Sequence, residues 1–349
     1  MRRLRWRWPI KTEPPACSRG GQFIEGGTVD TITELGGEVF EIDTRMGGHS
    51  GITAGYLIRG DRPCLIETGT ALSAPTVIES LAALGIGPDD LSTVVVTHIH
   101  LDHAGGVGDI AEAFPNAQVV VHERGARHLV DPTKLVASAR RVFGSIMDTM
   151  FGDLKPTDAA RVVALGDIGT IDLGGGRVLE SFHAPGHASH HVGLLDSATG
   201  DLYTGDAAGV YIPETADVRP ATPPPDFDLD LALSSMDRMG HIAPSRLLFS
   251  HYGPVTDVED VLGRSREELI RWVELVREAR TAQMGLDHAV AMVAERTHSA
   301  RLAELGPEAD AKWEALSSTA SNVVGISRWL DSVDGPGSTS GDAASVRNS

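Results

Sequence analysis

A run of apolar residues that ends in a cluster of metal-ligand side chains constrains this chain most. The stretch VVVTHIHLDHAGG (residues 94–106) places three histidines and one aspartate within six positions: His98, His100, Asp102 and His103. The continuously apolar start is typical of a strand buried on both faces. Because side chains alternate along a strand, His98 and His100 should point to the same side and can bind one metal ion together. Asp102 and His103 follow the strand, where a turn can direct them toward a second ion.

Three other predicted strands end in the same way. His187 follows a strand in the segment HAPGHASHH, Asp206 in LYTGDAAG and His251 in LLFSHYGP. Loops at strand ends are held by a rigid sheet, and binding sites are normally built there. Together with the first segment, the sequence offers five histidines and two carboxylates, which are enough ligands for two metal ions.

Strand and helix patterns alternate along the first half of the chain. Residues 73–85 predict a helix with one apolar face, formed by Val77, Ile78, Leu81 and Leu84. Short apolar segments bounded by turn residues predict strands. These segments are residues 38–42, 55–58, 64–67, 92–97, 117–122, 176–184, 191–196, 201–206 and 245–251. The alternation of strand, helix and strand indicates an α/β protein.

Residues 123–160 differ from this pattern and predict a helical insert. Four apolar residues are predicted to face inward from it: Leu135, Val142, Ile146 and Met150. Its other large apolar residues, Phe143, Met147 and Phe151, suit a lid over an apolar substrate group. Ordinary helix packing, or a contact between two copies of the chain, explains them equally well.

A second helical region follows the last predicted strand. Ser265 and Glu268 match a capping box and predict the start of a helix, whose inner face would carry Leu269, Val273 and Val276. More helix is predicted to about residue 330. The Gly/Ser-rich end of the chain predicts disorder.

These patterns divide the chain into four predicted parts. Residues 1–33 are predicted as a flexible extension and residues 34–256 as the catalytic domain. Residues 257–331 are predicted as a C-terminal helical subdomain and residues 332–349 as a disordered tail.

Composition narrows the class of partner. The net charge of −18 repels phosphate backbones, so the sequence argues against a nucleic-acid partner. The chain has only two cysteines, too few for a disulfide framework or a cysteine-based zinc site. It has no apolar run long enough to cross a membrane, and its basic start lacks the apolar core of a signal peptide. We therefore expect a cytoplasmic protein that acts on a small molecule, with no membrane partner, and the sequence leaves a homodimer open.

The four strand-end motifs resemble those of the metallo-β-lactamase superfamily in its dinuclear hydrolase form. The resemblance covers about residues 36–256, and the motifs occur in the order that the family has them. It implies an α/β fold in the form of a four-layer αββα sandwich, with metals bound at the edge of the sheets. The helical insert and the C-terminal helices would be additions to that sandwich.

The resemblance also implies a role for each ligand-type residue. The first ion would be held by His98, His100 and His187. The second would be held by Asp102, His103 and His251, and Asp206 would bridge the two ions. Asp102 and Asp206 would also be the catalytic carboxylates. Zinc is the expected metal for both positions, although Mn²⁺ and Fe²⁺ suit the same nitrogen and oxygen ligands.

One early motif departs from the family. The segment CLIETGT carries Glu67 where the family usually has aspartate before Thr-Gly. We expect Glu67 to orient a metal ligand, as the family's aspartate does, despite its longer side chain.

The implied activity is hydrolysis of a small ester, lactone or thioester by a metal-bridged hydroxide. The ligand motifs are similar to those of glyoxalase II-type thioesterases and of quorum-quenching lactonases. A persulfide dioxygenase with a single iron ion is an alternative from another reaction class. A metal-binding protein without catalysis is a further alternative.

Candidate substrate contacts are fewer. After Asp206 no lysine or arginine occurs before Arg219, which argues against a glutathione thioester as substrate. Lactonases carry a tyrosine three positions after the bridging aspartate, where this chain has Gly209. Tyr211, two residues further on, is a candidate substrate contact or a structural residue, and His190 is a second candidate.

Overall fold

Two β-sheets pack face to face in this protein. The computed structural model describes residues 30–334, except for the side chains of a few residues between 303 and 316. The first sheet is antiparallel from β1 to β4 and parallel from β4 to β7. Its strands, in spatial order, are β1 (Ile32–Gly36), β2 (Val39–Asp43), β3 (Ala54–Ile58), β4 (Cys64–Ile66), β5 (Thr93–Val95), β6 (Gln118–His122) and β7 (Val162–Leu165).

The second sheet is antiparallel except for the pair β11 and β14. Its strands, in spatial order, are β15 (Gly253–Val255), β14 (Arg246–Phe249), β11 (Asp201–Gly205), β10 (Val192–Asp196), β9 (Val178–His183) and β8 (Ile168–Asp172). A separate hairpin joins β12 (Val210–Ile212) and β13 (Asp217–Arg219).

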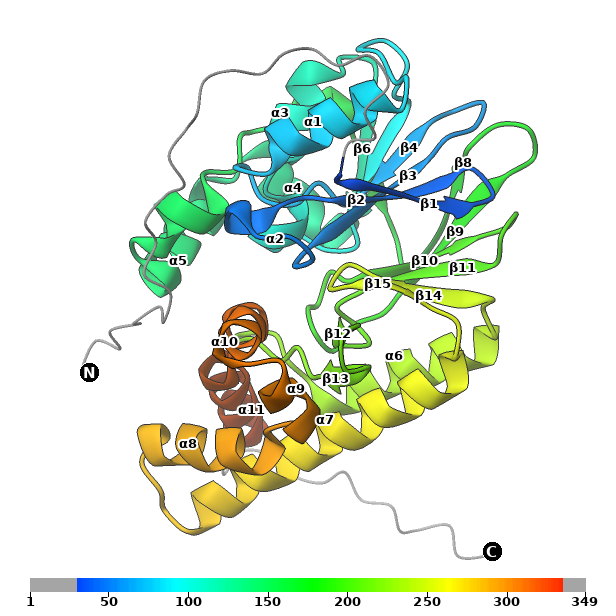
Figure 1. The fold of residues 1–349 in the computed structure, drawn as a ribbon. Helices are drawn as coiled ribbons and strands as arrows, with labels where there is room; N and C mark the ends of the chain where they lie inside the picture. Colours follow the sequence, from blue (N-terminus) through cyan, green and yellow to red (C-terminus); the bar gives the residue numbers. More distant parts are fainter. Residues whose placement is uncertain (1–29, 335–349) are drawn as a thin grey trace, which may run out of the picture.

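Helices cover the outer face of each sheet, as Figure 1 shows. On the side of the first sheet lie α1 (Ala74–Ala83), α2 (Leu101–Ala104), α3 (Val107–Ala113), α4 (Glu123–Val130) and α5 (Thr133–Phe143). On the side of the second sheet lie α6 (Leu229–Ile242), α7 (Val258–Thr281), α8 (Leu286–Thr297), α9 (Ala300–Glu304), α10 (Pro307–Leu316) and α11 (Thr319–Asp334). Short 3-10 turns occur at Met46–Gly48 and Ala159–Arg161, and a π-helical turn at Met147–Phe151. The predicted αββα architecture is confirmed.

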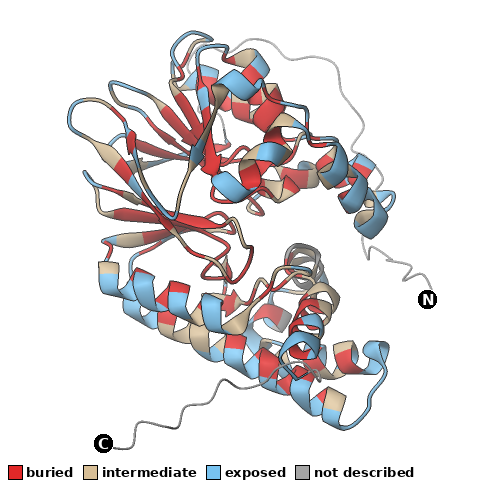
Figure 2. Ribbon diagram, turned by 180° about the vertical axis from the view of Figure 1, so that it is seen from behind, coloured by how far each residue is buried: buried red, intermediate tan, exposed pale blue. Residues whose placement is uncertain are grey.

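The alternation of side chains along each strand builds three apolar layers. In β3, Tyr56 and Ile58 join the core between the two sheets, whereas Leu57 joins the core under the helices of the first sheet. In β11, Tyr203 faces the core between the sheets and Leu202 the core under α6 and α7. The inner strands of each sheet are therefore buried on both faces, as Figure 2 shows in red, which explains their continuously apolar sequences.

The strands that the sequence did not predict lie mostly at sheet edges. They are β1, β7, β8, β12, β13 and β15. The edge strands β1 and β8 leave most of their residues partly or fully exposed, and Ile168 at the start of β8 is 75% exposed. An edge strand needs no continuous apolar run, so its sequence carries a weaker signal.

Two predictions about helices are wrong. The Ser265–Glu268 pair does not start a helix, because α7 begins at Val258 with Asp257 as its N-cap and Ser265 is buried inside it. Val142 does not face inward but is 51% exposed, because α5 lies at the margin of the molecule. The predicted inner face of Leu269, Val273 and Val276 is confirmed, since all three are buried.

The insert contributes to the core of the first sheet. Met147, Met150 and Phe151 are all buried and belong to the apolar cluster under the helices of that sheet. This burial favours ordinary packing over a lid for these side chains. Most of the predicted flexible extension and disordered tail lies outside the described residues. In residues 30–334 no helix has both the length and the apolar character needed to cross a membrane.

A buried ion pair within the second sheet holds an arginine that also contacts the first sheet. Nε of Arg177, next to β9, lies 3.0 Å from Oδ1 of Asp196, whose side chain is fully buried at the end of β10. Nη1 of Arg177 also donates a hydrogen bond of 2.9 Å to the carbonyl of Gly37, between β1 and β2 of the other sheet.

We predict that Arg177→Ala destabilises the protein by about 3–5 kcal/mol, because it leaves the Asp196 carboxylate buried and unpaired. Arg62→Ala is the matched control: its partner Asp172 and Arg62 itself are 61% and 57% exposed, so the loss should stay below about 1 kcal/mol. Urea unfolding of both variants measures the difference. Equal losses in the two variants would contradict the structural role assigned to Arg177.

Candidate metal centre

The predicted ligand residues converge at one edge of the sandwich. His98, His187, Asp206 and His251 each follow the end of a strand, namely β5, β9, β11 and β14. These strands belong to both sheets, and the ends that carry the ligands meet. The structure therefore brings together all seven residues that the sequence singled out as metal ligands.

Three imidazoles form the first group. Nε2 of His98 lies 3.0 Å from Nδ1 of His100, and Nε2 of His187 lies 2.9 Å from that same nitrogen. The three ring planes cross at 69–82°, so the in-plane lone pairs of the rings can converge on one point. Donors about 2.1 Å from a tetrahedral zinc ion lie roughly 3.4 Å apart, so these nitrogens are close enough to share an ion.

Two imidazoles and a carboxylate form the second group. Nε2 of His103 and Nε2 of His251 are 3.1 Å apart, and their rings cross at 88°. Oδ2 of Asp102 lies 3.5 Å from Nε2 of His251 and 3.8 Å from Nε2 of His103.

Asp206 lies between the two groups, and its carboxylate oxygens lie close to ligand nitrogens of both. Its Oδ2 is 3.5 Å from Nε2 of His187, in the first group. Its Oδ1 is 3.3 Å from Nε2 of His103 and 3.5 Å from Nε2 of His251, in the second group. Oδ1 is buried and accepts no hydrogen bond from the described residues, so it is free to bind a cation.

Hydrogen bonds on the far sides of the rings fix which nitrogen faces the site. Nδ1 of His251 donates to the carbonyl of Ile52 at 2.8 Å, and Nδ1 of His187 donates to the carbonyl of Ala221 at 2.9 Å. In the neutral form of each ring Nε2 therefore carries the lone pair, and such an arrangement is what metal-bound histidines usually show.

Glu67 performs the orienting function expected of it. Oε2 of Glu67 lies 2.8 Å from Nδ1 of His103, and Oε1 accepts the N–H of Thr97 at 2.7 Å. With Nδ1–H donated to Glu67, Nε2 of His103 faces Nε2 of His251 at 3.1 Å, and in the neutral rings both atoms carry lone pairs. Two facing lone pairs repel one another, so the arrangement of these donor atoms fits a cation between them.

The titration behaviour of the site separates the two groups. In the first group, burial and the neighbouring imidazoles lower the pKa of His98 far below its ordinary value and that of His100 to about 3. In the second group, burial also disfavours charge, but the carboxylates of Asp206 and Asp102 outweigh it and raise the pKa of His103. The second group thus attracts positive charge more strongly than the first.

The candidate substrate residues lie beside the site in different ways. His190 stacks parallel to His98 with ring centroids 6.2 Å apart, next to the first group. Tyr211 packs its ring against Phe249 at 5.8 Å, and its backbone N–H donates to the carbonyl of His251 at 2.6 Å.

The pair His190 and His191 also makes a contact that the sequence pattern did not assign to either residue. Nε2 of His191 accepts the backbone N–H of Asp206 at 3.1 Å, and the His191 ring is fully buried against the ring of His98. The sequence shows His191 only as the second histidine of a His-His pair, and a pair by itself does not tell which ring turns inward.

A further group of ligand-type residues, apart from the two described above, does not fit a metal. His122, Asp167 and His183 lie close together, but the two rings are stacked with only 12° between their planes. A metal must lie in the plane of each ring that binds it, and two parallel stacked planes share no such point. In addition, Nδ1 of His122 accepts the N–H of Arg124 at 3.3 Å, so its Nε2 carries the proton.

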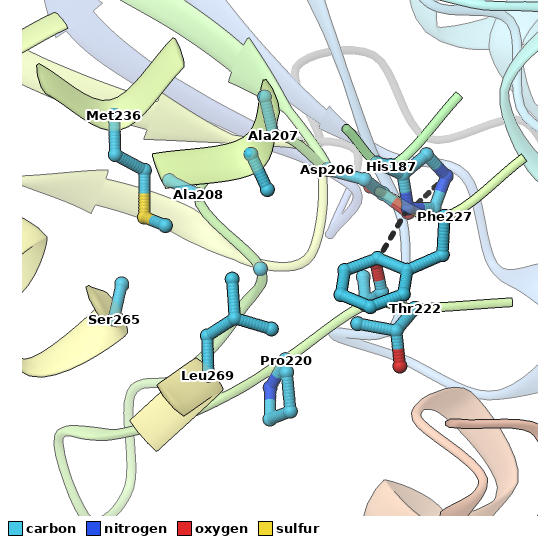
Figure 3. A pocket seen from close by; sticks show the side chains of 13 residues that line it. His187, Asp206, Ala207, Ala208, Pro220, Thr222, Phe227, Met236, Ser265 and Leu269 are labelled. Carbon is cyan, nitrogen blue, oxygen red and sulfur yellow. Dashed lines mark hydrogen bonds and ion pairs between the residues drawn. The ribbon is translucent and has the colours of Figure 1, made fainter. Parts of the chain in front are cut away.

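Figure 3 shows a small cavity behind His187 and Asp206. Its volume is about 20 Å³, which is space for about one water molecule, and its apolar wall includes Phe227, Met236 and Leu269. A larger hollow of about 390 Å³ includes Thr93 and Gln118, at the opposite ends of β5 and β6 from the ligands. Neither hollow is an open chamber for a substrate over the ligand groups.

The comparison with protein families gives the class of this protein. Residues 49–251 match the family described as the metallo-beta-lactamase superfamily, which spans every predicted ligand from His98 to His251. The chain therefore belongs to the metallo-β-lactamase superfamily, as the resemblance of its motifs implied. Proteins with this fold bind divalent metals, which agrees with the donor set described above.

Individual relatives agree on the fold. The chain is 32% identical over 171 residues to the metallo-beta-lactamase fold-containing protein ST1585 of Sulfurisphaera tokodaii, which covers 48% of this chain and 63% of that protein. The solved structure of ST1585 has a TM-score of 0.57 and 26% identity, over 66% of this chain and 86% of that one. The metallo-beta-lactamase family protein TTHA1429 from Thermus thermophilus has a TM-score of 0.56 at 20% identity, over 81% of this chain and 89% of that one, and shows the fold alone.

A third relative is a larger protein, of which the match covers only a part. The putative diflavin flavoprotein A 1 of Thermosynechococcus vestitus is 26% identical over 235 residues, which covers 64% of this chain but 35% of that protein. The chain thus spans less than two thirds of these curated relatives.

We predict that Glu67→Gln weakens zinc binding about 10–100-fold, the usual effect of losing an orienting partner. A carboxylate accepts from both Thr97 and His103, whereas an amide must turn its NH₂ toward one of these two donors. Competition with a chelator measures the affinity, and Glu112→Gln, an exposed partner of Lys155, is the control. Unchanged affinity in Glu67→Gln would show that the carboxylate does not orient His103.

We also predict that the second group loses metal at a higher pH than the first. The raised pKa of His103 means that protons compete with metal there as the pH falls, whereas the lowered pKa of His98 and His100 keeps those rings neutral to lower pH. His98→Ala leaves the second group intact, and His251→Ala leaves the first. Equilibrium dialysis should give the higher half-loading pH for His98→Ala, and the reverse order would refute this difference.

Proposed function

We propose that this protein is a metal-dependent hydrolase with two metal ions that cleaves a small ester, lactone or thioester. The observation that carries the proposal is the placement of Asp206, whose two oxygens lie 3.3–3.5 Å from ligand nitrogens of two separate groups. A single-ion site has no use for a carboxylate shared in this way.

In this proposal the residues divide between the two ions in the way that the resemblance implies. His98, His100 and His187 would hold one ion, Asp102, His103 and His251 the other, and Asp206 both. Divalent ions bound there would lower the pKa of coordinated water and polarise the carbonyl of a substrate. Zinc suits the imidazole-rich donor set, and Mn²⁺ and Fe²⁺ are alternatives.

Asp102 is the carboxylate that we assign to proton transfer. Its side chain is 23% exposed, whereas that of Asp206 is 7% exposed, so Asp102 is the more accessible of the two carboxylates. Burial alone would raise the pKa of Asp102, but His103 and His251 outweigh it and lower the pKa, which keeps the carboxylate in the ionised form that a proton acceptor requires and also makes it a weaker base.

The charge of the segment after Asp206 supports one class of substrate over another. Between Asp206 and Arg219 the hairpin β12–β13 brings no lysine or arginine to the ligand edge, so an anionic group such as that of glutathione finds no partner there. This favours a lactonase-like or simple esterase activity over a glutathione thioesterase within the glyoxalase II-like branch. The net charge of −18 supports a small-molecule substrate rather than a nucleic acid.

The test combines elemental analysis with a panel of ester, lactone and thioester substrates. We expect about two metal ions per chain and turnover of one substrate class. His100→Ala should lose metal and turnover together, because Nδ1 of His100 contacts both other rings of the first group. His241→Ala, an exposed histidine on α6, is the control.

Two outcomes would overturn this function. Turnover that survives complete removal of metal would exclude the assigned site. One iron ion per chain, with oxygen uptake on a persulfide and no hydrolysis, would assign the site to dioxygenase chemistry instead.

A further inference from the structure

His191 makes two contacts that join separate parts of the ligand centre. Its Nε2 accepts the backbone N–H of Asp206 at 3.1 Å. Its ring stacks on the ring of His98 with centroids 4.9 Å apart and 27° between the planes. The hydrogen bond holds the backbone of Asp206, which faces both ligand groups. The stacked ring lies against His98, a ligand of the first group.

The chain is closely fitted around this ring. A Cβ atom at Gly205 would overlap both Nε2 of His191 and Oγ1 of Thr97, so a side chain there would push the ring away from Asp206. Thr97 in turn lies 3.0 Å from Nδ1 of His98 through its Oγ1. Gly205, Thr97 and His191 thus form one packed support behind His98 and Asp206.

Only one of the two ring nitrogens of His191 makes a hydrogen bond to the residues that the structure describes. Nε2 of His191 accepts a hydrogen bond, so Nδ1 of the neutral ring carries the proton. That Nδ1 is buried and has no hydrogen-bond partner among residues 30–334. An apolar side chain of similar size would fill the space without leaving a buried N–H unpaired, so the acceptor at Nε2 is what a histidine contributes here.

We propose that His191 is a positioning residue that sets the orientation of the bridging carboxylate of Asp206, and through it the affinity of both ligand groups for metal. The inference rests on the proposed function, since it takes Asp206 as the shared ligand. Both carboxylate oxygens move with the Asp206 backbone, so the loss of one hydrogen bond at its N–H disturbs the two groups at once.

Three substitutions separate the acceptor from the volume of the ring. In His191→Gln the amide oxygen stands as many bonds from Cβ as Nε2 does, so it can accept the N–H of Asp206. His191→Leu keeps a comparable volume without an acceptor, and His191→Asn carries its oxygen too close to the backbone to reach. His241→Gln is the control for a histidine remote from the site.

The measurement is the affinity of the full-length metal-free protein for Co²⁺ and Zn²⁺, with the visible absorption of bound Co²⁺ as a readout of ligand geometry. We expect His191→Leu and His191→Asn to bind about 10-fold or more weakly and with an altered Co²⁺ spectrum. His191→Gln should stay within about threefold of the wild type and keep its spectrum, because it preserves the acceptor.

Two results would overturn the inference. One is wild-type affinity and spectrum in His191→Leu or His191→Asn. The other is an equal loss in His191→Gln and His191→Leu, which would reduce the ring to a packing role. If His191→Leu does not fold, the comparison of His191→Asn with His191→Gln decides the same question. The wild type tests the proposed function separately, because a wild type without two bound ions refutes that function whatever the variants do.

Discussion

The site depends on the mutual repulsion of donor atoms that are buried together. Nε2 of His103 and Nε2 of His251 face one another at 3.1 Å, and their protons are committed on the far side to Glu67 and to the carbonyl of Ile52. Asp206 adds a buried carboxylate to the same space. These buried donor atoms repel one another unless a positive charge lies among them. The raised pKa of His103 reflects this, because the neighbouring carboxylates favour a proton on its ring. A divalent cation bound among these donors would supply that charge.

The sandwich explains how these donors are held against their repulsion. Each ligand segment leaves a strand that is packed on both faces, so its start is fixed before the loop begins. The two sheets are joined by the core between them and by Arg177, which pairs with Asp196 and also donates to the carbonyl of Gly37 across the sheets. His98 comes from one sheet and His187, Asp206 and His251 from the other. The site is therefore a property of the packing between the sheets.

Two clusters of histidine and aspartate in this protein show why composition alone does not define a metal centre. In the ligand centre the rings cross at steep angles, and the outer nitrogens of His103, His187 and His251 face hydrogen-bond acceptors. In the group of His122, Asp167 and His183 the rings are parallel, and a backbone N–H faces the outer nitrogen of His122. The direction of the lone pairs separates the two cases.

The amino-acid sequence was enough to predict the buried strands, the inner face of the helix that carries Leu269, Val273 and Val276, and the residues that gather as ligands. Each of these follows from a local pattern: a continuous apolar run, a helical period, or a polar residue directly after a strand. The sequence did not give the half-exposed strands β1 and β8, and it placed the start of α7 at Ser265 instead of Val258, because edge strands and caps carry weak or repeated signals. The resemblance implied that Asp206 is shared, but the distances of its two oxygens from both groups, and the contact of His191 rather than His190 with its backbone, come from the folded structure. Local periodicity fixes which side of an element is apolar, whereas the direction of one imidazole toward another is fixed by how two sheets pack.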